Sequence, residues 1–311
     1  DELYIPEQDS YFNDTTENEK YLINYQINNK TDLFNHLIFD AFVNTGNEEE
    51  VVEPNSTPSQ RWFFGKRWRP AGTIRIWDTC RSEEVSQSYT PLEGAKILMR
   101  QWFTIDSGIT NANGYFSTGL VRGHARYIIQ WERYQYSIRT GNFGQAELRG
   151  PKLKKQDWNK DIQGGMDEFY GHIHRGAYHY YYKNIKNLRR PPENGFWKPQ
   201  MKIGGFNETG NINGNYRCSA RFMGILPAIR IYNPSNTSCE IYGTTIHELA
   251  HASHFNMKKT DYRPSDDKVK ESWARGVQWD LTRMIYPNYN PSEFRPKYTL
   301  VVRDMIDGLS G

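Results

Sequence analysis

Two histidines and a glutamate form the part of this sequence whose residue types and spacing point most directly to chemistry. They are His247, Glu248 and His251. In an α-helix, residues four apart lie one turn apart on nearly the same face, so the two imidazoles project side by side and can hold one metal ion. Glu248 lies beside the first histidine, where its carboxylate can take a proton from a metal-bound water. The motif predicts a zinc-dependent hydrolase and, among hydrolases, a peptidase.

The segment that carries this motif has the pattern of a buried helix. Residues 242–255 contain closely spaced apolar side chains and almost no charged residue of the exposed type. A buried helix with two histidines and a glutamate needs partners for these polar groups, and a metal ion supplies them. Residues 228–232 alternate like a strand, and the turn at 233–236 then leads into the helix. This order predicts a strand at the edge of a cleft.

A catalytic zinc site usually takes three protein ligands and leaves one position for water. His254 lies on the same helix, but three ligands from one helix give a strained tetrahedron. Glu271 opens a second amphipathic helix and can point inward across the helix pair, so we predict it as the third ligand. Three aspartates between the two helices are expected to be solvated: Asp261, Asp266 and Asp267.

Together these residues resemble the gluzincin metallopeptidases, thermolysin-like enzymes in particular. The spacing is His247-Glu248-x-x-His251, followed by Glu271 twenty positions after the second histidine. The run from Glu271 to Ala274 is similar to that of the aminopeptidase branch, and the tyrosine-rich residues 176–184 are similar to the helix that precedes the edge strand. The resemblance covers residues 165–286.

The resemblance implies a role for each of these side chains. His247, His251 and Glu271 would bind Zn²⁺, and Glu248 would act as general base toward the zinc-activated water before passing the proton to the leaving amine. Tyr262 stands where thermolysin-like enzymes place a tyrosine that donates to the oxyanion. The alternative for Tyr262 is an ordinary loop tyrosine.

Two positions depart from the family pattern. Arg275 stands where the family usually has an aspartate that orients a zinc histidine, so another group such as Asp280 or a backbone carbonyl is expected to do so. No histidine follows His254 in this sequence, so either the second oxyanion donor would be a tyrosine or an arginine, or the natural protein continues past Gly311. The candidates are Tyr286, Tyr289, Tyr298 and Arg283.

The wider pattern predicts a multidomain α+β protein. We expect an N-terminal segment of unknown fold (1–68), a β-sandwich (69–140), a linker (141–165) and a zincin-like domain (166–311). The last is expected to be mainly helical with a small edge-strand sheet. Residues 91–95 and 110–116 are similar to the carboxypeptidase regulatory-like (transthyretin-like) sandwich, and Asn113-Gly114 is a tight-turn signal in its own right.

Composition limits the partners and the location. The net charge of +3 is small and the basic residues are dispersed, so no nucleic-acid partner is expected. No apolar run approaches a membrane span. Among the three cysteines, a Cys218–Cys239 disulfide is compatible with the sequence and leaves Cys80 over. A polar, acidic start without Met is typical of an exported protein or lipoprotein, so an extracellular or cell-envelope location is expected.

These observations favour a secreted zinc metallopeptidase that acts on a peptide or protein substrate, with attachment to the cell envelope compatible with its start. A zinc hydrolase with a non-peptide amide substrate would use the same residues. The alternative from another class is a cell-surface protein that binds a glycan or a protein and carries a degenerate zincin domain.

Overall fold

The computed structural model describes residues 67–81, 88–101, 104–121, 123–195, 199–218, 226–291, 301–302 and 305. The chain divides into two units at Arg67, and the architecture described below belongs to the unit that starts at Trp68. The segment expected at 1–68 and the candidate Tyr298 fall almost entirely outside the described residues.

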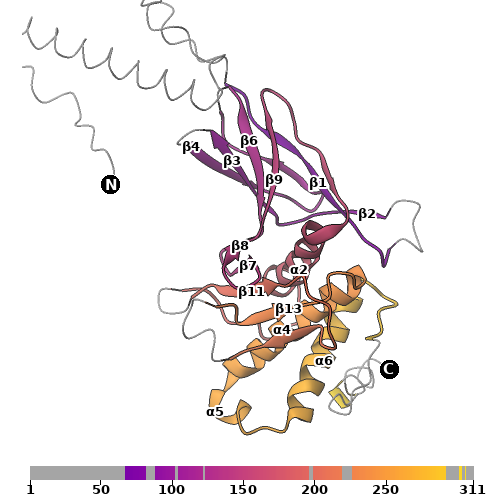
Figure 1. Cartoon of the computed structure of the whole chain (residues 1–311). Coiled ribbons are helices and arrows are strands. Elements are labelled where there is room, and N and C mark those ends of the chain that lie inside the picture. The colour runs from indigo at the N-terminus through magenta and orange to yellow at the C-terminus, as the bar shows by residue number, and fades with distance from the viewer. Residues whose placement is uncertain are drawn as a thin grey trace, which may run out of the picture. The chain divides into compact units, whose positions relative to one another are not determined.

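Two four-stranded sheets share one hydrophobic core (Figure 1). The first consists of β1 (Ala71–Trp77), β2 (Tyr89–Pro91), β5 (Tyr115–Ser117) and β10 (Lys160–Ile162). The second has the order β4 (Thr104–Ile109), β3 (Lys96–Gln101), β6 (Ala125–Gln130) and β9 (Glu147–Leu153), all antiparallel. Alternating side chains such as Ile74 and Ile76 of β1 and Ile97 and Met99 of β3 fill the space between the sheets.

A third sheet of five strands carries the helices. Its order is β12 (Gly214–Tyr216), β13 (Ile229–Ile231), β11 (Met201–Gly205), β7 (Tyr136–Thr140) and β8 (Gly144–Gln145). The three central strands are parallel, and each outer strand runs antiparallel to its neighbour. In the described part of the chain, β12 pairs with β13 alone, so its other side forms an edge of the sheet.

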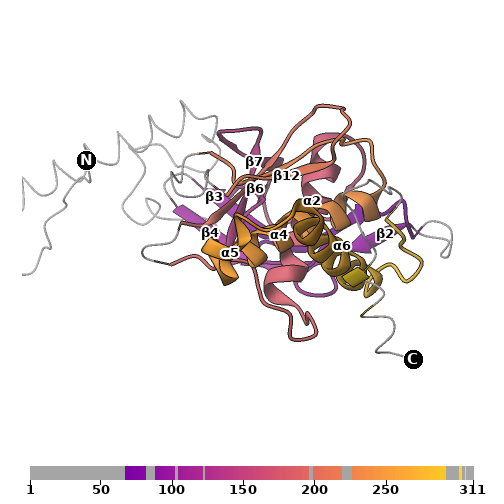
Figure 2. The same ribbon diagram turned by 90° about the horizontal axis from the view of Figure 1, so that it is seen from below.

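The helices are α2 (Gly165–Tyr182), α4 (Ser238–Met257), α5 (Lys259–Tyr262) and α6 (Asp267–Arg283). Helix α4 packs against both α2 and α6, and Figure 2 shows α4 beside α6. A capping box of Thr237 and Glu240 starts α4, and the Asp266 side chain accepts from the Lys268 amide at the start of α6. Gly176 lets α2 approach α4 closely, because a Cβ there would lie 2.8 Å from the Tyr242 carbonyl oxygen.

No described helix combines the length and apolar character of a membrane span.

The expected fold class, a sandwich followed by a mainly helical catalytic domain, is wrong. The described residues form three sheets of four or five strands and only four helices. Residues 141–165, expected as a linker, contain all of β8, β9 and β10, and β7 joins the five-stranded sheet through β11. Strands of two or three residues are too short to show an alternating pattern, which is why the sequence did not reveal them.

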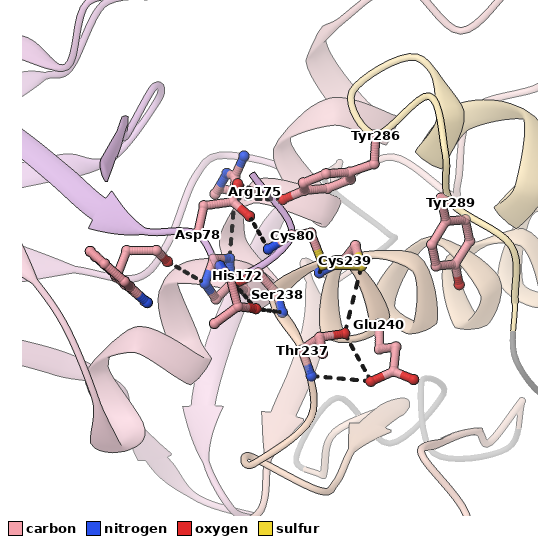
Figure 3. The surroundings of a disulfide bond; sticks show 12 residues. Asp78, Cys80, His172, Arg175, Thr237, Ser238, Cys239, Glu240, Tyr286 and Tyr289 are labelled. Atoms are coloured by element: carbon pink, nitrogen blue, oxygen red, sulfur yellow. Dashed lines mark hydrogen bonds and ion pairs between the residues drawn. A yellow bond between two sulfur atoms is a disulfide. The ribbon is translucent and has the colours of Figure 1, made fainter. Parts of the chain in front are cut away.

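A disulfide fastens the end of the first sheet to the start of α4. It joins Cys80 to Cys239, 159 residues apart, and Cys218 is a free thiol, so the Cys218–Cys239 pairing that the sequence allowed does not form (Figure 3). Thr79 and Ser238 reinforce the junction: each backbone amide donates to the other residue's hydroxyl at 2.9 Å.

A buried ion pair lies beside this disulfide. The Arg175 guanidinium of α2 donates to the Asp78 carboxylate at 2.8 Å, and the Tyr286 hydroxyl donates to the same oxygen, also at 2.8 Å (Figure 3). Asp78 follows β1 and Tyr286 follows α6, so three distant segments meet at one carboxylate. Removing one partner of such a pair would leave an uncompensated buried charge.

Removing the disulfide tests its contribution to stability. We expect Cys80→Ser combined with Cys239→Ser to lower the free energy of unfolding by about 2–5 kcal/mol, because the bond closes a long loop in the unfolded chain. Urea denaturation followed by tryptophan fluorescence measures this. An unchanged midpoint and slope relative to the wild type would show that the bond contributes nothing.

The buried histidine His174 predicts a pH-dependent stability. Its Nε2 donates to the Glu93 carbonyl and its Nδ1 accepts from the Tyr136 hydroxyl, both at 3.0 Å, and burial lowers its pKa to about 4. Below pH of about 6.5 the unfolded chain binds a proton that the folded chain does not, so stability falls between about pH 6.5 and 4. His174→Gln is expected to reduce this slope in urea titrations; an identical slope in both proteins would contradict the assignment.

Candidate metal centre

Helices α4 and α6 bring two imidazoles and a carboxylate to one point. His247 and His251 lie one turn apart on α4 and are buried, and Glu271 faces them from the first half of α6. The two Nε2 atoms are 3.1 Å apart, and Glu271 Oε2 lies 3.1 Å from His247 Nε2 and 3.4 Å from His251 Nε2. Among the described residues, these three form the group of side chains arranged to hold a metal ion.

The partners of the outer imidazole nitrogens fix which atoms face inward. Gln278 Nε2 donates to the Tyr289 hydroxyl at 2.7 Å, so its Oε1 faces His247 Nδ1 at 3.1 Å. An amide oxygen only accepts, so His247 Nδ1 carries the proton and Nε2 presents a lone pair. The hydroxyl of Tyr262 lies 3.2 Å from His251 Nδ1, and we assign the equivalent tautomer there. Each histidine therefore has an outer-shell partner of the kind found around metal ligands.

This donor set fits zinc. Zinc takes imidazole nitrogen and carboxylate oxygen at about 2.0–2.2 Å in tetrahedral geometry, which places ligand atoms about 3.3 Å apart. The observed separations of 3.1 to 3.4 Å leave a point about 2 Å from all three atoms. Without a cation or protons between them, three electron-pair donors would repel one another at these distances.

Burial and neighbouring charges set the protonation of the group. Burial lowers the pKa of His247 to about 4, which keeps this imidazole neutral and able to bind a metal. In the metal-free site, burial opposes the ionisation of Glu271, but hydrogen bonds from protonated Nε2 atoms of His247 and His251 outweigh it and hold the pKa of the carboxyl well below its usual range. Burial likewise opposes the protonation of His251, but Glu271 and Glu248 outweigh it and raise the pKa of this imidazole, so a bound cation would have to replace a proton there. Burial raises the pKa of Glu248 to about 7, and a hydrogen bond with the Tyr216 backbone partly offsets the rise.

Glu248 lies between the metal ligands and the edge strand. It is buried on α4, and a Cβ added to Gly214 of β12 would lie 2.6 Å from its Oε1. Only glycine at this position lets the strand backbone pass so close to the carboxylate. Glu248 therefore lies over one face of β12. Among the described residues, the side of β12 that faces away from β13 is unpaired and can receive an extended chain near this carboxylate.

Several predicted site residues lie elsewhere. Asp280 does not orient a histidine as suggested, because its carboxylate pairs with Lys186 at 2.6 Å. The Tyr286 hydroxyl is bound to Asp78, and Arg283 Nε donates to the Pro287 carbonyl. His254 lies outside the ligand group, as the strained geometry of a third ligand from one helix predicted.

Gln278 is the outer-shell residue that the sequence reasoning missed. It lies seven residues after Glu271, two helical turns along the same face of α6, and it is buried against His247. That spacing is the signal that could have identified it. The family pattern has an aspartate as the partner of a zinc histidine, and the neutral amide of Gln278 does not match that pattern. Tyr289, considered as an oxyanion donor, instead holds the Gln278 amide in place.

Comparison of the chain with models of protein families, with curated proteins and with solved structures found no match.

Substitution of Gln278 tests its role as the partner of His247. We expect Gln278→Leu to weaken zinc binding about 10- to 100-fold, because the buried Nδ1–H then lacks an acceptor and the ring loses its orientation. Gln278→Glu keeps an acceptor oxygen and should retain or strengthen binding. Competition with a fluorescent zinc chelator measures both affinities. Equal affinity of the leucine variant and the wild type would contradict this role.

Proposed function

We propose that this protein is a zinc metallopeptidase that hydrolyses peptide bonds, with His247, His251 and Glu271 as metal ligands and Glu248 as general base. The observation that carries the proposal is the convergence of these three ligand atoms beside a buried carboxylate on the same helix. Kinship with the gluzincins is part of the proposal and is supported by the same four residues.

We expect each residue of the site to have a separate role in hydrolysis. A zinc ion at this site supplies a Lewis acid that lowers the pKa of water and polarises a carbonyl group. Glu248 accepts the proton of the attacking water and then donates it to the departing amine. Gln278 and Tyr262 hold the two imidazoles, and burial of the ligands excludes bulk water from the back of the site.

The unpaired edge of β12 favours a peptide over a non-peptide amide as the substrate. An extended peptide can add to a sheet edge through main-chain hydrogen bonds, and β12 passes directly along Glu248. A peptide aligned on β12 would bring its carbonyl groups past that carboxylate. A small non-peptide amide would make no use of the strand edge.

Tyr262 is proposed as a second hydroxyl of the site. Burial raises its pKa, so the hydroxyl keeps its proton at neutral pH. In the assigned tautomer the hydroxyl accepts from His251 Nδ1–H, which supports a part in orienting this ligand, and its own proton stays free for donation to an acceptor such as the oxyanion.

Secretion, with attachment to the cell envelope, remains part of the proposal. The disulfide between Cys80 and Cys239 supports it, because such bonds persist in oxidising compartments. The intact ligand set and Glu248 argue against the alternative of a binding protein with a degenerate site.

Three substitutions separate metal binding from catalysis. We expect Glu248→Gln to retain one zinc per chain and to lose about 10²- to 10⁴-fold in peptide cleavage, since the amide cannot accept the proton. His251→Gln should lose zinc, whereas the control His254→Gln on the same helix should keep it. Zinc is measured by elemental mass spectrometry and cleavage with a mixed peptide library.

Two results would contradict the proposal. One is cleavage by Glu248→Gln at the wild-type rate. The other is a wild-type protein that binds one zinc ion and cuts no peptide of the library, which would favour the binding protein instead.

A further inference from the structure

The four-stranded sheet β4-β3-β6-β9 has an outer face that lies away from the core. Ile97 and Met99 of β3 and Tyr127 and Ile129 of β6 point into the core, so the alternate residues point outward. Of these, Leu98 and Ile128 at the centre are buried, whereas Arg100 and Arg126 beside them are exposed. The strand register arranges these outward residues in rows that cross the sheet, and Figure 1 shows the four strands side by side. We call this surface the outer face.

One row of the outer face consists of cations. Arg100 lies directly opposite Arg126, and Arg126 lies opposite Lys152. Arg149 extends the positive charge into the next row, opposite Ile128. All four cations are exposed. Like charges directly opposite one another in a sheet destabilise it, so this row is unfavourable for the fold alone.

Carboxylates neutralise only part of this charge. Glu147 lies 3.7 Å from Arg100, and Glu132 binds Lys96 at 2.6 Å. Within the part of the chain that the structure describes, no carboxylate pairs with Arg126 or Arg149. Residues 67–311 contain 35 lysines and arginines but 23 aspartates and glutamates, so the surroundings also attract anions.

The edge strand β4 adds exposed apolar side chains to the same face. Ile105 lies opposite Arg100 and is 62% exposed, and Ile109 lies opposite Lys96 and is 43% exposed. A soluble polyanion gains nothing from exposed isoleucines. A single-stranded nucleic acid would be expected to use aromatic side chains, and the rows described above contain none. Cations beside exposed aliphatic side chains suit the surface of an anionic bilayer, where phosphates lie above acyl chains.

We propose that the outer face docks the protein onto an anionic lipid membrane. Arg100, Arg126, Arg149 and Lys152 contact lipid phosphates, while Ile105 and Ile109 enter the boundary between headgroups and acyl chains. Docking in this way is peripheral, reversible and sensitive to salt. It is independent of the metal centre, whose residues lie on α4 and α6.

Vesicle cosedimentation of the full chain tests the proposal. We expect binding to vesicles of equimolar phosphatidylglycerol and phosphatidylcholine, weak binding to phosphatidylcholine alone, and loss of binding at about 1 M salt. Arg126→Glu and Arg149→Glu should each reduce the partition coefficient about ten-fold or more. Arg189→Glu makes the same change of charge at an exposed residue outside the face and serves as the control.

Two further measurements test the proposal: the thermal midpoint of an arginine variant and the vesicle binding of an isoleucine variant. Arg126→Glu should leave the thermal midpoint unchanged or raise it, because its carboxylate would face Arg100 and Lys152. Ile105→Ser should weaken vesicle binding several-fold while leaving binding to soluble heparin unchanged.

Three results would overturn the proposal. The first is wild-type binding to anionic vesicles no stronger than to neutral ones. The second is that Arg126→Glu and Arg149→Glu both bind like Arg189→Glu. The third is full vesicle binding by Ile105→Ser, which would make the outer face a general anion-binding surface.

Discussion

Helices α4 and α6 place three electron-pair donors so close together that they repel one another unless a proton or a cation lies between them. Two imidazole nitrogens and a carboxylate oxygen lie within 3.4 Å of one another, and the histidines are buried. Gln278 accepts from His247 Nδ1, so the proton of this imidazole faces away from Glu271, and Tyr262 suits the same tautomer in His251. A cation between the three atoms would then be the simplest group to remove their mutual repulsion. The proposed chemistry of Glu248 depends on that cation.

The surrounding fold holds this arrangement from both ends. The disulfide and the hydroxyls of Thr79 and Ser238 hold the first turn of α4 against the end of β1. The segment after α6 is held by Tyr286 on Asp78, and by Tyr289 on the Gln278 amide that faces His247. A connected series of buried polar contacts therefore leads from the junction with the first sheet to His247. Contacts of this kind would hold the imidazole in place before a metal ion binds, which favours affinity.

The proximity of His247, His251 and Glu271 was easier to predict than the fold, for a physical reason. His247, Glu248 and His251 lie within one helical turn, and Glu271 opens a second amphipathic helix, so local periodicity was enough to bring them together. The five-stranded sheet depends on parallel pairing of β7 with β11, far apart in sequence, and on strands as short as β8 and β12. The Cys80–Cys239 bond and the partnership of Gln278 with His247 likewise depend on tertiary contacts. None of these leaves a periodic signal in the sequence.

Zinc K-edge X-ray absorption of the full chain with one equivalent of zinc tests the central claim most directly. The account predicts a four-coordinate ion with two imidazole nitrogens and carboxylate oxygen at about 2.0–2.2 Å. It also predicts that Glu271→Ala removes the carboxylate contribution or the metal itself. A spectrum with a sulfur ligand, or one that Glu271→Ala leaves unchanged, would place the zinc elsewhere and contradict the account.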